Sequence, residues 1–324
     1  MTEEVLLAGM NDRRSFITGI KSTVLSVKER KFLHQYKPWG VILFSRNIIS
    51  LKQAKELTDQ IKKIFKDKNY PILIDQEGGR VNRLKKFLNT DPLTGEFFGK
   101  LYLKDKQMFY NYYKTFIKIT SLLLKSIGAN INTLPVLDLR FRGSSSIIGD
   151  RSFSKDPKIV SKIGDICINN FHLNNIGTVI KHIPGHGLAK VDSHKLTPIV
   201  NENLKYLIKN DFSTFKKKSS LFAMTAHIIY RKIDKTNTAT HSKKIIQLIR
   251  NNIKFKNIIM SDDIAMKSLK NSIKVNTLRA FDAGCDLVLH CNGNIKEMYD
   301  VAINSPLISK RIIKKTSQFY KIIS

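Results

Sequence analysis

The stretch TVIKHIPGHG, residues 178–187, decides the fold class of this chain. It begins with a short apolar run, Thr178 to Ile180, and Lys181 and His182 follow at once. Beyond them, Pro184 and two glycines exclude a regular helix, because these residues are the poorest helix formers. We therefore expect a buried strand that ends in polar side chains and opens into a shaped loop, a common location for binding and catalytic residues.

The same arrangement recurs along the chain, with longer amphipathic stretches between the apolar runs. The apolar runs are Val5–Leu7, Val41–Phe44, Ile72–Ile74, Ile131–Leu137, Thr178–Ile180, Leu221–Met224, Ile258–Met260 and Leu287–Leu289. The amphipathic stretches include Leu51–Phe65, Gln107–Ser126, Pro157–Asn174, Ser242–Asn251 and Val275–Ala283. Strand and helix alternating about eight times predict an α/β fold, a (β/α)8 TIM barrel with parallel strands.

Polar side chains follow most of the predicted strands directly. Asp75 follows Ile74, Asp138 follows Leu137, and Ser261 precedes Asp262 after Met260. In a closed barrel the carboxyl ends of all strands converge on one mouth, whereas an open doubly wound sheet binds ligands only near a switch point. Polar residues spread over so many strand ends favour the closed barrel.

Length and composition indicate one large domain. The chain has 324 residues, is 42% hydrophobic, and shows no linker-like segment or short repeat, so we expect a single domain over residues 1–324. The N-terminus lacks the pattern of a secretory signal, and no apolar stretch has transmembrane length. The three cysteines form no CxxC pair. We therefore expect reduced thiols, a cytoplasmic location and no membrane partner.

The net charge of +30 allows two interpretations. Lys and Arg number 56 against 26 Asp and Glu, which is compatible with a nucleic-acid or anionic-polymer partner. The excess is mostly lysine scattered along the chain, without a long basic tail. A solvated lysine-rich surface and no specific nucleic-acid partner are expected. The alternative is a basic glycan- or nucleic-acid-binding protein on an inactive barrel.

Asp262 and Asp263 end the apolar run of residues 258–260. A carboxylate at a strand end can act as a nucleophile, a base or a metal ligand. Neighbouring strand residues point in opposite directions, so only one of the two is expected in the mouth. We assign the chemistry to Asp262, and to Asp263 the N-cap of a helical pattern at Ile264–Leu269.

Asp192 and His194 form a second candidate pair. A carboxylate beside an imidazole can fix its tautomer and raise its basicity, which suits a proton shuttle near neutral pH. A metal is the alternative use of the histidines His182, His186, His194 and His227. Pro184 and Gly185 prevent His182 and His186 from taking helical zinc-site geometry, so we expect no metal and no cofactor.

Two further motifs carry candidate ligand-binding groups. Asp75 and Arg83 lie in ILIDQEGGRVNRL, and Arg151 lies in IIGDRSFS. An aspartate and an arginine at these places suit sugar hydroxyls or a carboxylate. The alternatives are a buried ion pair that steadies the loop for Asp75 and Arg83, and a surface location for Arg151.

Taken together, these motifs resemble glycoside hydrolase family 3, and within it the single-domain bacterial β-N-acetylglucosaminidases of cell-wall recycling. The resemblance is carried by GVILFSRNI, ILIDQEGGRVNRL, LPVLDLR, IGDRSF, KHIPGHG with DSH, MTAHIIY, MSDDIAM and AGCDLVLHCN. It extends from about Trp39 to Asn292. Ile183 and Thr225 depart from residues common in the family, which bears on fine substrate preference only.

The resemblance implies a retaining hydrolysis through a covalent glycosyl-enzyme. Asp262 matches the nucleophile, His194 the general acid/base and Asp192 its dyad partner. Residues matching those that bind the terminal N-acetylglucosamine are Asp75, Arg83, Arg151, Lys181 and His182. The implied substrate is an N-acetylglucosaminyl-anhydro-muropeptide from peptidoglycan, cleaved by a monomer in the cytoplasm.

Overall fold

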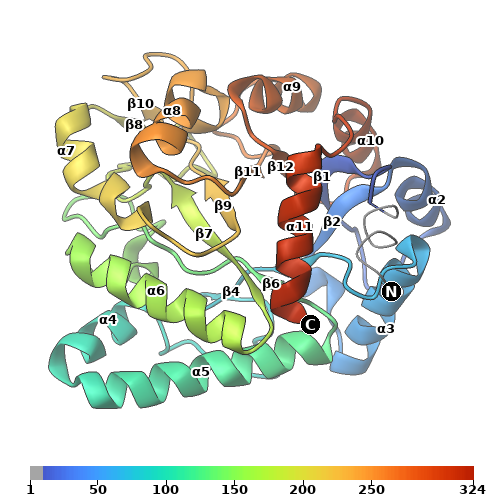
Figure 1. The fold of residues 1–324 in the computed structure, drawn as a ribbon, viewed down its shortest axis with the longest axis horizontal. Coiled ribbons are helices and arrows are strands. Elements are labelled where there is room, and N and C mark those ends of the chain that lie inside the picture. The colour runs from blue at the N-terminus through green and yellow to red at the C-terminus, as the bar shows by residue number, and fades with distance from the viewer. Residues whose placement is uncertain (1–9) are drawn as a thin grey trace.

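The computed structural model describes residues 10–324, and a closed barrel of eight parallel strands forms its centre (Figure 1). The strands follow one another around the barrel in the order β1 (Arg14–Gly19), β12 (Leu287–His290), β11 (Ile258–Asp263), β9 (Phe222–Thr225), β7 (Gly177–Ile183), β6 (Ile131–Asn132), β3 (Ile72–Ile74) and β2 (Pro38–Leu43). β1 pairs in parallel with both β2 and β12, which closes the barrel. The predicted α/β barrel is confirmed.

Two strand predictions need correction. The barrel's first strand is β1, which the sequence analysis did not identify, and the run Val5–Leu7 lies outside the described residues. The run Ile131–Leu137 is too long, since β6 covers only its first two residues. Pro135 has no N–H for a strand ladder. The regular ladder stops before it, and the chain then contacts β7 through an isolated bridge between Val136 and Lys181.

Helices surround the barrel (Figure 1). They are α2 (Val27–Tyr36), α3 (Leu51–Phe65), α4 (Gly95–Lys104), α5 (Lys106–Ser126), α6 (Pro157–Leu173), α7 (Leu204–Lys209), α8 (Lys243–Leu248), α9 (Ile273–Ala283), α10 (Ile295–Ile303) and α11 (Lys310–Ile323). Polar side chains define where they start: Ser50 caps α3 by accepting from the Gln53 amide, and Asp156 caps α6 ahead of Pro157. Such caps satisfy amides that have no partner within the helix.

The expected helix at Ile264–Leu269 is wrong, because these residues form turns and α9 begins only at Ile273. The expected helix at Ser242–Asn251 ends early as an α-helix, and a π-helical segment, η5 (Ile249–Ile253), continues it. Further short elements are the antiparallel pair β4 (Gln76–Gly78) and β5 (Val81–Asn82), the parallel pair β8 (Ile199–Val200) and β10 (Ile229–Tyr230), and the 3-10 turns η1 (Ser45–Asn47), η2 (Gly149–Arg151), η3 (Asp211–Phe215) and η4 (Ala239–His241).

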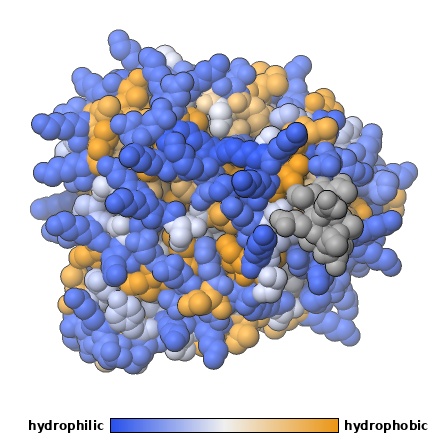
Figure 2. All heavy atoms as spheres, in the orientation of Figure 1, coloured by the Kyte–Doolittle hydropathy of each residue, from blue (hydrophilic) through white to orange (hydrophobic). Residues whose placement is uncertain are grey.

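Apolar side chains fill both the barrel interior and the layer between strands and helices. The helix α11 lies across the barrel strands in Figure 1 and packs Phe319 against Phe222, which in turn contacts Trp39. The Trp39 indole N–H donates to Thr316 Oγ1 of α11 at 2.8 Å. The face of the molecule seen in Figure 2 is mostly hydrophilic, with scattered apolar patches. Within residues 10–324, no helix combines the length and the apolar character needed to span a membrane.

The buried bond between Trp39 and Thr316 should stabilise the fold measurably. We expect Thr316→Val to lower the free energy of unfolding by about 1–3 kcal/mol, because the substitution keeps the shape but leaves the buried indole N–H without an acceptor. Thermal unfolding followed by circular dichroism measures this. The matched control is Thr115→Val in α5. Both hydroxyls donate to the carbonyl four residues earlier, but Thr115 is exposed. Equal losses of stability in the two variants would contradict the assignment.

Candidate active site

A pocket of about 250 Å³ lies at the carboxyl ends of the barrel strands. Its lining consists of Asp75, Glu77, Arg80, Val81, Arg83, Ile147, Ile148, Arg151, Lys181, His182, His186, Ser193, His194, Met224, Asp262, Leu289 and Cys291. The predicted site residues are therefore brought together from across the sequence. Only Asp192 is missing from the lining, and it contacts the pocket through His194.

A cluster of ion pairs lies at the centre of this lining. The Lys181 ammonium is 3.2 Å from Asp75 Oδ1 and 2.6 Å from Glu77 Oε1, and it also donates to Thr133 Oγ1 at 2.9 Å. Arg83 Nη2 lies 3.0 Å from Asp75 Oδ2. Asp75 and Arg83 thus form the ion pair considered as an alternative, and both also line the pocket.

Sequence reasoning assigned no role to Glu77. It stands two residues after Asp75 at the end of β3, and residues two apart in extended chain share a face. That spacing was the available signal, since it places both carboxylates toward Lys181. Burial opposes ionisation of both groups. Lys181 and Arg83 nevertheless hold the pKa of Asp75 well below its usual range, and Arg151 and Lys181 lower the pKa of Glu77 to about 2. Both are carboxylates at neutral pH.

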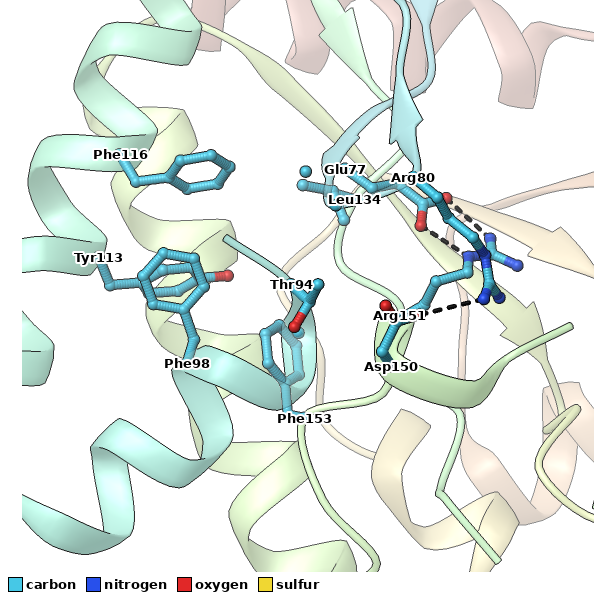
Figure 3. A pocket seen from close by; sticks show the side chains of 13 residues that line it. Glu77, Arg80, Thr94, Phe98, Tyr113, Phe116, Leu134, Asp150, Arg151 and Phe153 are labelled. Atoms are coloured by element: carbon cyan, nitrogen blue, oxygen red, sulfur yellow. Dashed lines mark hydrogen bonds and ion pairs between the residues drawn. The ribbon is translucent and has the colours of Figure 1, made fainter. Parts of the chain in front are cut away.

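Arg151 is not a surface residue, because its side chain is only 10% exposed. Its Nε and Nη2 donate to the two carboxylate oxygens of Glu77, each at 2.8 Å, in the bidentate geometry visible in Figure 3. Burial alone would lower the pKa of Arg151, but Glu77 raises it above its ordinary value. The guanidinium is therefore held as a cation beside the pocket.

Asp138 organises the loop that follows β7. Its Oδ2 lies 2.6 Å from His182 Nδ1, and its Oδ1 accepts from the His186 amide at 2.6 Å. His186 Nε2 lies 3.1 Å from Ser193 Oγ, which joins the start of the loop to the DSH segment. Burial lowers the pKa of His186 to about 4, so its ring is neutral at pH 7. Asp138, which follows a predicted strand, therefore fixes the His182 ring and the backbone at His186.

Asp192 and His194 form the predicted pair. His194 Nδ1 lies 2.9 Å from Asp192 Oδ1, and the same oxygen accepts from the His194 amide at 2.8 Å. With the carboxylate at Nδ1, the opposite ring nitrogen, Nε2, is the one available for proton exchange. The His194 side chain is 61% exposed, so it sits at the open side of the pocket.

Asp262 and Asp263 separate as the strand alternation predicts. Asp262 lines the pocket, while Asp263 Oδ1 accepts from the amides of Ala265 at 3.1 Å and Cys291 at 3.2 Å. Asp263 therefore caps a turn and not the expected helix. Burial opposes ionisation of Asp262, but His227 and His182 lower its pKa below the ordinary value. Asp262 is thus a carboxylate that faces the cavity.

The histidines considered as metal ligands have other partners. His227 hydrogen-bonds to Thr240 Oγ1 and to the Asp263 carbonyl, and it does not line the pocket. Among residues 10–324, no group of three or more His, Cys, Asp or Glu side chains is arranged to hold a metal ion. The arrangement that is present combines a carboxylate, a carboxylate-bound imidazole and several fixed cations, which suits acid–base hydrolysis of a polar substrate.

Comparison with known proteins agrees with this class of site. Residues 18–319 match the family described as the glycosyl hydrolase family 3 N-terminal domain, and the chain belongs to that family. A β-hexosaminidase from Nitrosomonas eutropha is 33% identical over 281 residues, which cover 84% of this chain and 79% of the relative. The expectations of a family 3 protein and of a glycosidase are confirmed.

Solved structures agree as well. NagZ from Neisseria gonorrhoeae in complex with N-trifluoroacetyl-D-glucosamine superposes with a TM-score of 0.86 at 28% identity, covering 95% of this chain and 90% of that one. The same protein in complex with a zinc ion gives a TM-score of 0.84 at 27% identity, with the same coverage. The fold of this chain, an α/β barrel, is that of the NagZ structures.

The depressed pKa of Glu77 makes stability depend on pH in a defined window. The folded value of about 2 lies below the ordinary value of 4.5, so in this window the unfolded chain binds more protons. This contribution is fully present above about pH 4.5 and is lost as the pH falls toward 2. We expect Glu77→Gln to flatten the fall of the melting temperature between pH 4.5 and 2. Parallel slopes for wild type and variant would contradict the lowered pKa of Glu77 in the folded protein.

Proposed function

We propose that this chain is a retaining exo-β-N-acetylglucosaminidase that removes a terminal non-reducing N-acetylglucosamine. The observation that carries the proposal is the pocket shared by Asp262, His194 and the ion cluster around Lys181. The β-hexosaminidase relatives and the N-trifluoroacetyl-D-glucosamine complex of the N. gonorrhoeae protein support the same substrate class. The cluster of buried side chains forms the pocket wall, which suits one terminal sugar.

In the proposed first step, the Asp262 carboxylate attacks the anomeric carbon of the sugar. The bond to the leaving oxygen breaks, and the His194 imidazolium donates its proton to that oxygen. Asp192 stabilises the imidazolium before transfer and fixes the ring through Nδ1. In the second step, neutral His194 takes a proton from water, and the water oxygen displaces Asp262 from the anomeric carbon. The sugar leaves with its original anomeric configuration.

The remaining predicted residues would hold the sugar. Asp75 and Lys181 carry oppositely charged groups that can accept from and donate to hydroxyls. Arg83, Arg151 and His182 supply further polar groups on the pocket wall. Because these groups are already fixed by their own ion pairs and hydrogen bonds, little reorganisation is needed when the substrate binds.

The physiological substrate we propose is an N-acetylglucosaminyl-anhydro-muropeptide, which would place the reaction in peptidoglycan recycling. We further propose that residues 1–324 act as one catalytic domain, as a monomer in the cytoplasm, and without a specific nucleic-acid partner. The β-hexosaminidase names of the relatives support the sugar specificity, and the resemblance noted in the sequence supports the pathway.

The roles of Asp262 and His194 can be tested by substitution. We expect Asp262→Ala to lower kcat for an aryl β-N-acetylglucosaminide by several orders of magnitude. His194→Ala should lower it by roughly 10²–10⁴-fold, the usual contribution of general acid–base catalysis. His34→Ala serves as control, because His34 is an exposed histidine in α2. Near-normal turnover by Asp262→Ala would rule out the proposed nucleophile.

Metal dependence separates this mechanism from a zinc hydrolase, a question raised by the zinc complex of the N. gonorrhoeae protein. We expect turnover to be unchanged after exhaustive treatment with EDTA and gel filtration, because each step above is assigned to side chains. The assay is hydrolysis of the same aryl substrate before and after chelation. Loss of activity that zinc alone restores would contradict the proposal.

A further inference from the structure

Glu77 joins two cations that belong to different parts of the chain. Its Oε1 lies 2.6 Å from Lys181 Nζ and 2.8 Å from Arg151 Nη2, while its Oε2 accepts from Arg151 Nε at 2.8 Å. The exposed fractions of the three side chains are 4% for Glu77, 3% for Lys181 and 10% for Arg151. One buried carboxylate therefore connects the end of β7 to η2.

The backbone on both sides of this link has little freedom to shift. A Cβ atom at Gly78 would overlap the Leu93 carbonyl, and one at Gly95 would overlap the Arg151 carbonyl. Gly95 begins α4, so the turn that carries Arg151 lies directly against this helix. Figure 3 shows the Glu77–Arg151 pair on one side of a pocket and aromatic side chains, including Phe98 and Tyr113, on the other. The scaffold thus fixes where the Glu77 carboxylate lies.

Charge explains why a carboxylate is needed at this place. Arg83, Lys181 and Arg151 contribute three positive charges to the cluster, whereas Asp75 and Glu77 contribute two negative charges. Asp75 is shared by Arg83 and Lys181, whereas Arg151 pairs with Glu77. Without Glu77, the Arg151 guanidinium would lose the one carboxylate that it pairs with among residues 10–324, and it would lie near Lys181, a second buried cation. Unpaired buried charges are strongly unfavourable, so the side chains would move apart.

We propose that Glu77 is a positioning residue that sets the distance between Lys181 and Arg151, so that both cations meet the same sugar ring. It acts through these two side chains, since both of its oxygens are already engaged by them. The inference rests on the proposed function, because it takes the sugar as the ligand that the two cations share. It gives the pocket a source of rigidity that does not depend on the substrate.

The test is Glu77→Gln, which keeps the shape and removes the charge. We expect kcat/KM for the aryl β-N-acetylglucosaminide to fall by about 10- to 100-fold, as when partners that orient ligand-binding groups are lost, and KM to rise. The affinity for N-acetylglucosamine, measured by calorimetry, should fall in parallel. In an Arg151→Met background, Glu77→Gln should lower kcat/KM by a much smaller factor, because one of the two cations that Glu77 positions is gone.

Asp286→Asn is the matched control, because Asp286 forms a comparable pair at the opposite end of the barrel. Its Oδ2 lies 2.7 Å from Arg250 Nη2 and accepts from the Ile259 amide at 2.8 Å, just before β12 begins. We expect this variant to lose stability but to keep kcat/KM and affinity for the sugar.

The outcomes are distinguishable. If wild type is active and folded Glu77→Gln keeps kcat/KM within about twofold, the positioning role is overturned while the proposed function stands. Equal losses of kcat/KM in Glu77→Gln and Asp286→Asn would also overturn it, because they would show a general effect on stability. Wild-type protein that neither hydrolyses the substrate nor binds N-acetylglucosamine would overturn the proposed function itself.

Discussion

Closure of eight parallel strands is the constraint on which the rest of the structure depends. Parallel strands in a closed barrel must all end on the same side, so residues that follow strands meet whatever their distance in sequence. Asp75 directly follows β3, Lys181 and Asp262 lie in β7 and β11, and all three line one cavity. At the amino-terminal ends of the strands the barrel is closed by packing: α11 contributes Phe319 to the apolar cluster there and binds Trp39 through Thr316.

Electrostatic balance is the second requirement at the mouth. Burying several cations and carboxylates is favourable only when each has partners, since isolated buried charges are strongly destabilising. The pairs Arg83–Asp75, Lys181–Glu77 and Arg151–Glu77 provide these partners. The same pairs hold the polar groups of the pocket wall in fixed directions. The interactions that compensate the buried charges at the mouth therefore also fix the geometry of the pocket.

Local sequence signals predicted most of the barrel and much of the site. The apolar run at Ile72–Ile74 matches β3, and amphipathic spacing located α3 with its correct bounds. The runs within β7 and β11 were also identified, but both strands continue three residues beyond the predicted ends. The pair Asp192–His194 was also predictable, because its members are two residues apart.

The strand β1, the role of Glu77 and the position of Gly95 could not be predicted, because they depend on contacts between residues far apart in the sequence. β1 mixes polar and apolar residues in RSFITG, although all but its first residue are buried, so its burial arises from pairing with β2 and β12. Glu77 gains its role from Arg151, 74 positions later. The tight contact of Gly95 with Arg151 is visible only when α4 and η2 are placed together.

The most direct test of the account is to find where the sugar becomes attached. The reagent is a 5-fluoro N-acetylglucosaminyl fluoride. Its ring fluorine destabilises the oxocarbenium-like transition states of both steps, but the good leaving group fluoride keeps the first step fast, so the sugar should attach to the enzyme quickly and be hydrolysed from it slowly. Peptide mass spectrometry of the trapped protein should show one added sugar, on Asp262. A sugar on Asp263, Asp75 or any other residue, or turnover without an adduct, would contradict the account.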